Sequence, residues 1–149
     1  MPVASVGAWE FWVPDGWDLE DRGDGVSYLE APDGTKGMYV KCIELPEPRS
    51  CPEDLAQYIQ QTHEASFTQL EGSAWVVVDR RSRSEALLHK SALDMLDSGA
   101  SYRVLSIVVC DARVAIQVTL HDYLCEDYDV AEDTFTAIED SIGAVAGAA

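Results

Sequence analysis

Strand-forming and helix-forming segments follow one another in an order that restricts the fold of this chain. Short runs rich in aromatic and β-branched residues come first, at residues 9–13, 26–30 and 38–45. A helix is expected near residues 52–65, followed by four strands within residues 75–120 and a closing helix over residues 127–142. Because strands and helices do not alternate, the order excludes βαβ units. It predicts an α+β domain in which both helices pack on a single antiparallel β-sheet.

The ends of both helices carry recognisable signals. Ser50 and Glu53 have the spacing of a capping box, and Pro52 stands in the first turn, where its missing N–H costs little. We expect this helix to end near Ala65. Gly143 is the expected stop of the closing helix.

One segment, residues 85–97, is ambiguous between helix and strand. Its alanines and leucines suit a helix by propensity, but Asp97-Ser98-Gly99 has the composition of a hairpin turn. Strands are expected on both sides of this segment. We therefore predict a strand that forms a hairpin with residues 102–110.

The length and composition of the chain indicate one folded domain. A chain of 149 residues has a common domain size, and 47% of its residues are hydrophobic. The sequence has no internal repeat and no linker-like segment. We therefore expect a single domain over residues 1–149, with residues 144–149 as a frayed tail.

The acidic residues greatly outnumber the basic ones. The chain has 27 acidic and 10 basic residues, which gives a formal net charge of -17, and Arg113 is the last basic residue. The electrostatic field of this negative charge repels nucleic acids and anionic membranes and attracts basic protein surfaces. The composition therefore favours a protein partner with a basic or apolar surface over nucleic acid or membrane. A homodimer is a further option.

Six residues are candidates for contact with such a partner. The acidic ones lie in or just before the closing helix, outside its apolar stripe, and two tryptophans are candidates for the open side of the sheet. The candidates are Trp12, Trp17, Glu126, Asp129, Glu132 and Asp133. Packing in the core is the alternative for both tryptophans. A basic cluster at Arg80, Arg81 and Arg83 is expected in a loop, paired with nearby acids.

No motif in the sequence predicts catalysis or a bound cofactor. The three histidines form no HExxH pattern, the four cysteines form no CxxC pair, and GxSxG and phosphate-loop patterns are missing. We therefore predict no catalytic, cofactor-binding or metal-binding residues and no enzymatic activity. The alternative is a domain that binds or converts a small ligand in a pocket between sheet and helices. A pocket lined by His89 or His121 and a carboxylate would favour it.

Several motifs, taken in order, resemble those of the PsbP-like (Mog/PsbP-like) superfamily of small α+β domains. Val13-Pro14-Asp15-Gly16-Trp17 is similar to the opening motif of that family, and residues 54–59 are similar to its mid-chain helix. Residues 116–120 end a similar hairpin-rich stretch, and residues 135–142 are similar to its closing helix. The resemblance covers nearly the whole chain.

The resemblance implies a fold and a class of function. Members of the PsbP-like superfamily mostly bind other proteins, and one bacterial branch of it contains chaperones for effectors of type VI secretion. The N-terminus lacks the basic and apolar regions of a secretory signal, and no apolar run is long enough to span a bilayer, so we expect a cytoplasmic location. The leading hypothesis is a non-enzymatic bacterial effector chaperone or an immunity protein for a secreted toxin. A third reading assigns the acidity to solubility alone.

Overall fold

The computed structural model describes residues 3–21, 25–72, 74–85, 87–97, 99, 101–124 and 128–144; for residues 21, 128–131 and 144 it describes the backbone only. The helices are α1 (Pro52–Thr68) and α2 (Tyr128–Ser141). The strands are β1 (Val3–Val6), β2 (Trp9–Trp12), β3 (Asp18–Asp21), β4 (Val26–Glu30), β5 (Lys36–Glu44), β6 (Trp75–Glu85), β7 (Leu88–Asp97), β8 (Tyr102–Cys110), β9 (Val114–Asp122) and β10 (Gly143–Ala144).

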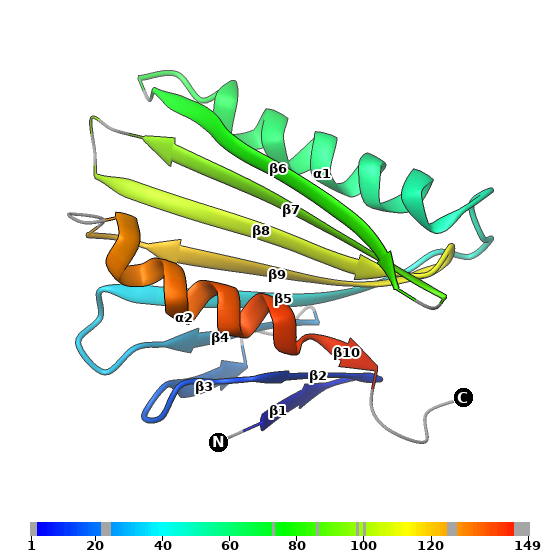
Figure 1. Cartoon of the computed structure of the whole chain (residues 1–149), viewed down its shortest axis with the longest axis horizontal. Helices are drawn as coiled ribbons and strands as arrows, with labels where there is room; N and C mark the ends of the chain where they lie inside the picture. The colour runs from blue at the N-terminus through cyan, green and yellow to red at the C-terminus, as the bar shows by residue number, and fades with distance from the viewer. Residues whose placement is uncertain are drawn as a thin grey trace.

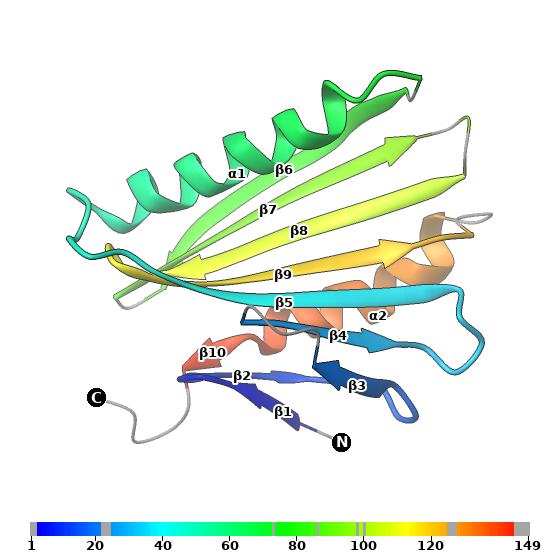
Figure 2. The same cartoon turned by 180° about the vertical axis from the view of Figure 1, so that it is seen from behind.

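The described strands form two antiparallel sheets. The large sheet has the order β3-β4-β5-β9-β8-β7-β6, and a small sheet has the order β1-β2-β10. Helix α1 lies on one face of the large sheet, and α2 with the small sheet lies on the other (Figures 1 and 2). The α+β class is therefore confirmed, whereas the prediction of a single sheet is wrong.

The second sheet forms because the aromatic strand β2 pairs with the two ends of the chain. It forms a hairpin with β1 through a turn in which Gly7 has a φ of +59°, and it pairs with β10 directly after α2. Trp9 and Phe11 alternate inward from β2 and contact the same core as Phe135 of α2. The small sheet thus packs face to face on the large one and closes its α2 side.

The predicted strands of the large sheet are present, β6 is longer than predicted, and the edge strand β3 was not predicted. Residues 88–97 form β7, as predicted, in a hairpin with β8. Strand β6 continues from Trp75 to Glu85, so the arginine cluster lies in a strand, and its predicted placement in a loop is wrong. The outer strand β6 pairs with β7 over almost its whole length, with a register shift between Val77 and Asp79.

Both ends of α1 differ from the sequence prediction. Cys51 is its N-cap residue and caps with no side-chain hydrogen bond, so the predicted capping box is wrong. The carboxylate of Glu53 instead accepts a hydrogen bond from the hydroxyl of Ser84 on β6. The helix ends at Thr68 rather than near Ala65.

Neither described helix has the length and apolar character that a membrane span requires.

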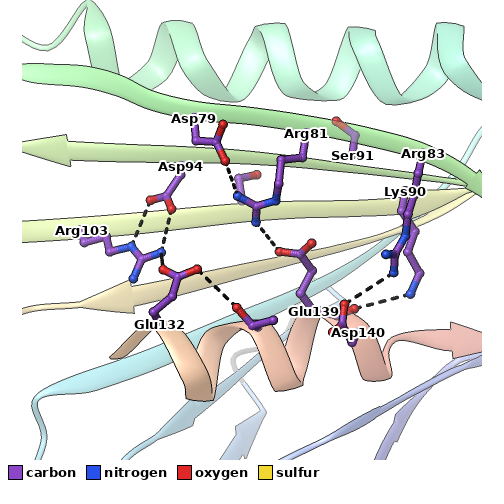
Figure 3. Close-up of polar contacts among 12 residues, drawn as sticks. Asp79, Arg81, Arg83, Lys90, Ser91, Asp94, Arg103, Glu132, Glu139 and Asp140 are labelled. Carbon is purple, nitrogen blue, oxygen red and sulfur yellow. Dashed lines mark hydrogen bonds and ion pairs between the residues drawn. The ribbon is translucent and has the colours of Figure 1, made fainter. Parts of the chain in front are cut away.

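A fully buried arginine connects the large sheet to α2. Arg103 on β8 is 0% exposed, and its Nε and Nη2 atoms donate to the two oxygens of Asp94 on β7 at 3.0 and 2.7 Å. Its Nη2 also donates to Oε2 of Glu132 on α2 at 2.6 Å, as Figure 3 shows. The guanidinium carbon lies 5.0 Å from the ring centre of Phe135. A buried charge is stable only when it is paired in this way.

Replacing Arg103 by leucine should strongly destabilise the protein. The change removes the cation that the buried carboxylate of Asp94 binds, and breaking a buried pair costs about 3–5 kcal/mol. The matched control is Arg80→Leu, because Arg80 forms an exposed ion pair with Glu64, and such pairs contribute less than about 1 kcal/mol. Urea denaturation measures both free energies of unfolding. Equal losses for the two variants would contradict the structural role of Arg103.

Candidate functional site

Three acids of α2 pair with arginines of the sheet, and one of them, Glu132, is a predicted contact residue. Besides the Glu132–Arg103 pair, Glu139 accepts from Arg81 at 2.6 Å, and Asp140 lies 3.5 Å from Arg83 (Figure 3). The arginine cluster is thus paired with acids, as predicted. The charges of Glu132, Glu139 and Asp140 are thus balanced within the protein.

The other predicted contact residues of this region have different positions. Asp133 on α2 is exposed. The backbone of Asp129 lies in α2, but its side chain is outside the description, and Glu126 lies outside the described residues altogether. A binding role for any of these acids remains a prediction.

Both predicted tryptophans are partly buried and pack against the main core. The indole nitrogen of Trp12 is buried and has no hydrogen-bond partner among the described residues, while its backbone N–H donates to Oγ of Ser141 at 2.7 Å. Trp17 contacts the same core from the segment before β3. Core packing, the alternative reading of the sequence, therefore accounts for most of the surface of both residues.

The large sheet has α2 and the small sheet on one face and α1 on the other, and about half of the α1 face carries no helix among the described residues (Figures 1 and 2). Helix α1 packs on β7 and β8, touches β6, and reaches β9 at Ala115 and Gln117. Among the described residues, β3, β4, most of β5 and the rest of β9 lie beside the helix and not under it (Figure 2). We call the α1-side surface of these four strands the open half-face. The strand registers place on it Asp18, Glu20, Tyr28, Glu30, Tyr39, Lys41, Gln117, Thr119 and His121.

An aromatic cluster occupies the centre of the open half-face. The ring centre of Tyr39 lies 4.6 Å from that of Tyr28 and 5.2 Å from that of His121. Tyr123 stacks on His121 with 5.7 Å between the ring centres, and Tyr102 contacts both. Tyr39, Tyr102 and Tyr123 are only partly buried. The cluster therefore presents ring surface to solvent.

Gly37 makes room for two of these tyrosines. A Cβ at this position would lie 2.4 Å from Oη of Tyr28 and 2.8 Å from Oη of Tyr123, which is closer than real Cβ contacts. The two hydroxyls lie 3.1 Å from each other and form a hydrogen bond. A side chain at residue 37 would displace both rings.

His121 is the buried polar group of this cluster. Its Nδ1 lies 2.6 Å from Oη of Tyr102, and the side chain is 8% exposed. Burial, with a smaller contribution from His63, lowers the pKa of His121 to about 4, and burial raises the pKa of Tyr102 to about 12. Both groups are therefore neutral at neutral pH. His121 adds no positive charge to the open half-face.

Carboxylates line the outer end of the open half-face. The register places Asp18 opposite Glu30 and Glu20 opposite Tyr28, and these residues with Asp33 line a depression of about 420 Å³. Like charges directly opposite each other on neighbouring strands destabilise a sheet. A positive charge bound between them would relieve this repulsion. The site thus combines ring faces with carboxylates, which is the chemistry that recognises cations.

Of these residues, only His121 was a candidate in the sequence. A signal was present, because β5 alternates Met38 and Val40, which enter the core, with Tyr39 and Lys41, which do not. Such alternation marks a strand with only one fully buried face. It would have located the open side of the sheet on β5 rather than beside Trp12.

A second site lies between α1 and β6–β7. His89, Glu53 and several polar residues line a pocket of about 370 Å³, with Nδ1 of His89 3.0 Å from Oγ of Ser84 and 3.8 Å from Oε1 of Glu53. Serine and carboxylate thus approach the same ring nitrogen. A nucleophilic triad places them at opposite nitrogens, so this arrangement lacks that relay. No group of three or more metal-ligating side chains occurs within the described ranges.

Comparisons with known proteins identify the fold. The solution structure of cyanobacterial PsbP (CyanoP) from Synechocystis sp. PCC 6803 matches with a TM-score of 0.68 and 19% sequence identity, over 93% of this chain and 87% of that chain. The chain has a PsbP-like fold. A crystal structure from Bacteroides thetaiotaomicron VPI-5482 matches with a TM-score of 0.52 and 13% identity, over 94% of this chain and 46% of that one. No family model and no curated protein sequence matches.

These comparisons confirm the fold resemblance that the sequence motifs indicated. The PsbP-like fold accounts for the antiparallel sheet and the two helices. At this identity the likeness concerns the fold alone, because function belongs to sites rather than to scaffolds. The function therefore depends on the side chains of the site and not on the fold.

Protonation of His121 should make the protein less stable below neutral pH. An unfolded histidine has a pKa near 6.5, whereas the folded value is about 4, so between these values only the unfolded state binds the proton. Stability from His121 is fully present above pH ~6.5 and falls by roughly 3 kcal/mol as the pH drops to 4. Urea denaturation at several pH values gives the free energy of unfolding as a function of pH. Between pH 4 and 6.5 this free energy should change less steeply with pH in His121→Phe than in the natural chain. Identical slopes would contradict the buried, neutral state of His121.

Proposed function

We propose that this protein is a non-enzymatic protein-binding module that docks a cationic segment of its partner on the open half-face. One observation carries the proposal: Tyr28 lines the same depression as the carboxylates of Asp18 and Glu30, and its ring contacts the partly exposed ring of Tyr39 on the neighbouring strand. Lysine or arginine side chains of the partner would lie over the rings and between the carboxylates. The partner's apolar side chains would contact the remaining ring surface.

Electrostatics supports this choice of partner. A cation over an exposed aromatic ring gains about 0.5–1 kcal/mol, and several such contacts add to one another. The net charge of -17 attracts a basic segment from a distance and repels an acidic one. Lys41 is a basic residue of the same face, and it lies at the end opposite to the carboxylates. The surface therefore favours a segment with its positive charge at the β3–β4 end.

The finer proposal is that this partner is a secreted toxin and that the protein acts in the bacterial cytosol as its chaperone or immunity protein. Support comes from the acidic charge and from a docking face that suits an exposed basic and apolar segment. The gene next to this one should encode the toxin, and its product should co-purify with the protein. Normal secretion and normal self-protection in a deletion strain would contradict this assignment.

Reversing one charge on the open half-face should weaken binding of a cationic peptide. In Glu30→Lys the new ammonium lies opposite Asp18 and beside the rings, where it repels the peptide's own cations. We expect at least a tenfold loss of affinity for a peptide that alternates lysine and leucine, measured by calorimetry at physiological salt. Asp133→Lys is the control, because it makes the same charge change on the exposed side of α2.

The control separates a local effect from a general one. Equal losses in Glu30→Lys and Asp133→Lys would mean that the peptide responds to net charge alone, and the docking surface would be wrong. A larger loss in Asp133→Lys would support the acidic surface of α2 that the sequence predicted.

A second candidate function rests on the pocket of His89 and Glu53. The pocket has a volume of about 370 Å³, and the amides of Gln57 and Gln61 also line it. This volume suits a small polar ligand. Such a ligand would raise the melting temperature of the natural chain but not that of His89→Phe. A screen of polar metabolites without any such shift would contradict this candidate.

A further inference from the structure

An apolar cavity lies between α1 and β5, at the edge of the open half-face. Its volume is about 280 Å³, and most of its wall is hydrocarbon. The lining residues from β5 and the segment after it are Lys41, Ile43 and Leu45, and those from α1 include Leu55, Tyr58, Ile59 and Thr62. Lys41 and Gln117 belong to both the cavity and the open half-face. The two surfaces are therefore continuous.

The position of α1 creates this cavity. Leu55 and Ile59 are buried against Val108 of β8 and Ala115 of β9, and the helix packs on β7 and β8 rather than over β5. Tyr58, on the β5 side of the helix, stays 52% exposed, and the guanidinium of Arg49 lies 4.5 Å from its ring centre. An apolar wall thus faces Ile43 across a gap that the described chain does not fill.

We infer that this cavity accepts one large apolar side chain of the same cationic segment, so that the partner is recognised at two points. This inference rests on the proposed function. The carboxylates of Asp18 and Glu30 on the same face repel anionic lipid headgroups and acidic peptides, which leaves a basic protein segment as the occupant. A cavity of 280 Å³ holds a phenylalanine or leucine side chain, and buried aromatic anchors of this kind dominate the affinity of many interfaces.

The sheet geometry gives the spacing between the two points. Glu30 lies opposite Gly37 on β5, and Ile43 lies six residues further along the same strand. Six residues of an antiparallel strand span about 20 Å. An extended partner segment would therefore carry its basic residues and its apolar anchor about six residues apart.

A pair of peptides tests the inference. The first carries two lysines, five glycine or serine residues and a phenylalanine, and the second has alanine in place of phenylalanine. Burial of the phenylalanine ring predicts about tenfold tighter binding of the first peptide to the natural chain, measured by calorimetry. Thr62→Trp, which fills the cavity, should make the two peptides bind equally.

Thr68→Trp is the matched control for this variant. Thr62 and Thr68 are both exposed on α1, and each hydroxyl donates to the carbonyl four residues earlier, but Thr68 does not line the cavity. In this variant the tenfold preference should remain. Its loss would overturn the inference, because the preference would then not depend on the cavity.

The outcomes for the two proposals are distinguishable. Equal binding of both peptides to the natural chain, with weaker binding to Glu30→Lys, overturns the anchor cavity and leaves the cationic docking surface in place. A preference for phenylalanine that Thr62→Trp abolishes, with no effect of Glu30→Lys, supports the cavity and overturns the role of the carboxylates.

Discussion

The width of a single helix determines how this molecule presents its surface. Seven antiparallel strands span about 30 Å across, whereas one helix with its side chains is about 10–12 Å wide. Helix α1 therefore covers β6, β7, β8 and one end of β9 on its side of the large sheet. The strands beside it must carry side chains that tolerate water. Tyr39, Lys41 and Glu30 reach solvent at these positions, whereas Tyr28 and His121 are buried in the aromatic cluster.

The opposite face is closed by different means. The small sheet and α2 cover it together, and the main core lies between them and the large sheet. Arg103 binds Asp94 within the sheet and Glu132 on α2, so the helix has a fixed position over β7 and β8. Glu132 of α2 thereby stabilises the fold. A closed face on one side and a half-open face on the other leave the α1 side as the better candidate for docking.

The sequence predicted the elements of this fold better than their pairing. Local signals located both helices and seven strands, and the ambiguous segment at residues 85–97 was correctly predicted as a strand from its flanking turn. The short strands β1, β3 and β10 were not predicted. The second sheet was missed because the pairing of Gly143–Ala144 with β2 depends on contacts between the two ends of the chain. The capping box failed for a similar reason, since Glu53 finds Ser84 on a distant strand. For the site, the sequence pattern indicated acidic residues along α2. The acidic pair Asp18 and Glu30 could not be predicted, because the register that places them opposite each other follows only from sheet topology.

The central claim is that the open half-face is the docking surface, and amide chemical-shift mapping tests it most directly. The ¹⁵N-labelled protein would be titrated with the cationic peptide that alternates lysine and leucine. The account predicts shifts concentrated on β3, β4, β5 and β9, with the largest near Asp18, Glu30 and Tyr39. Shifts concentrated on α2 and the small sheet, or spread evenly over all acidic residues, would contradict it.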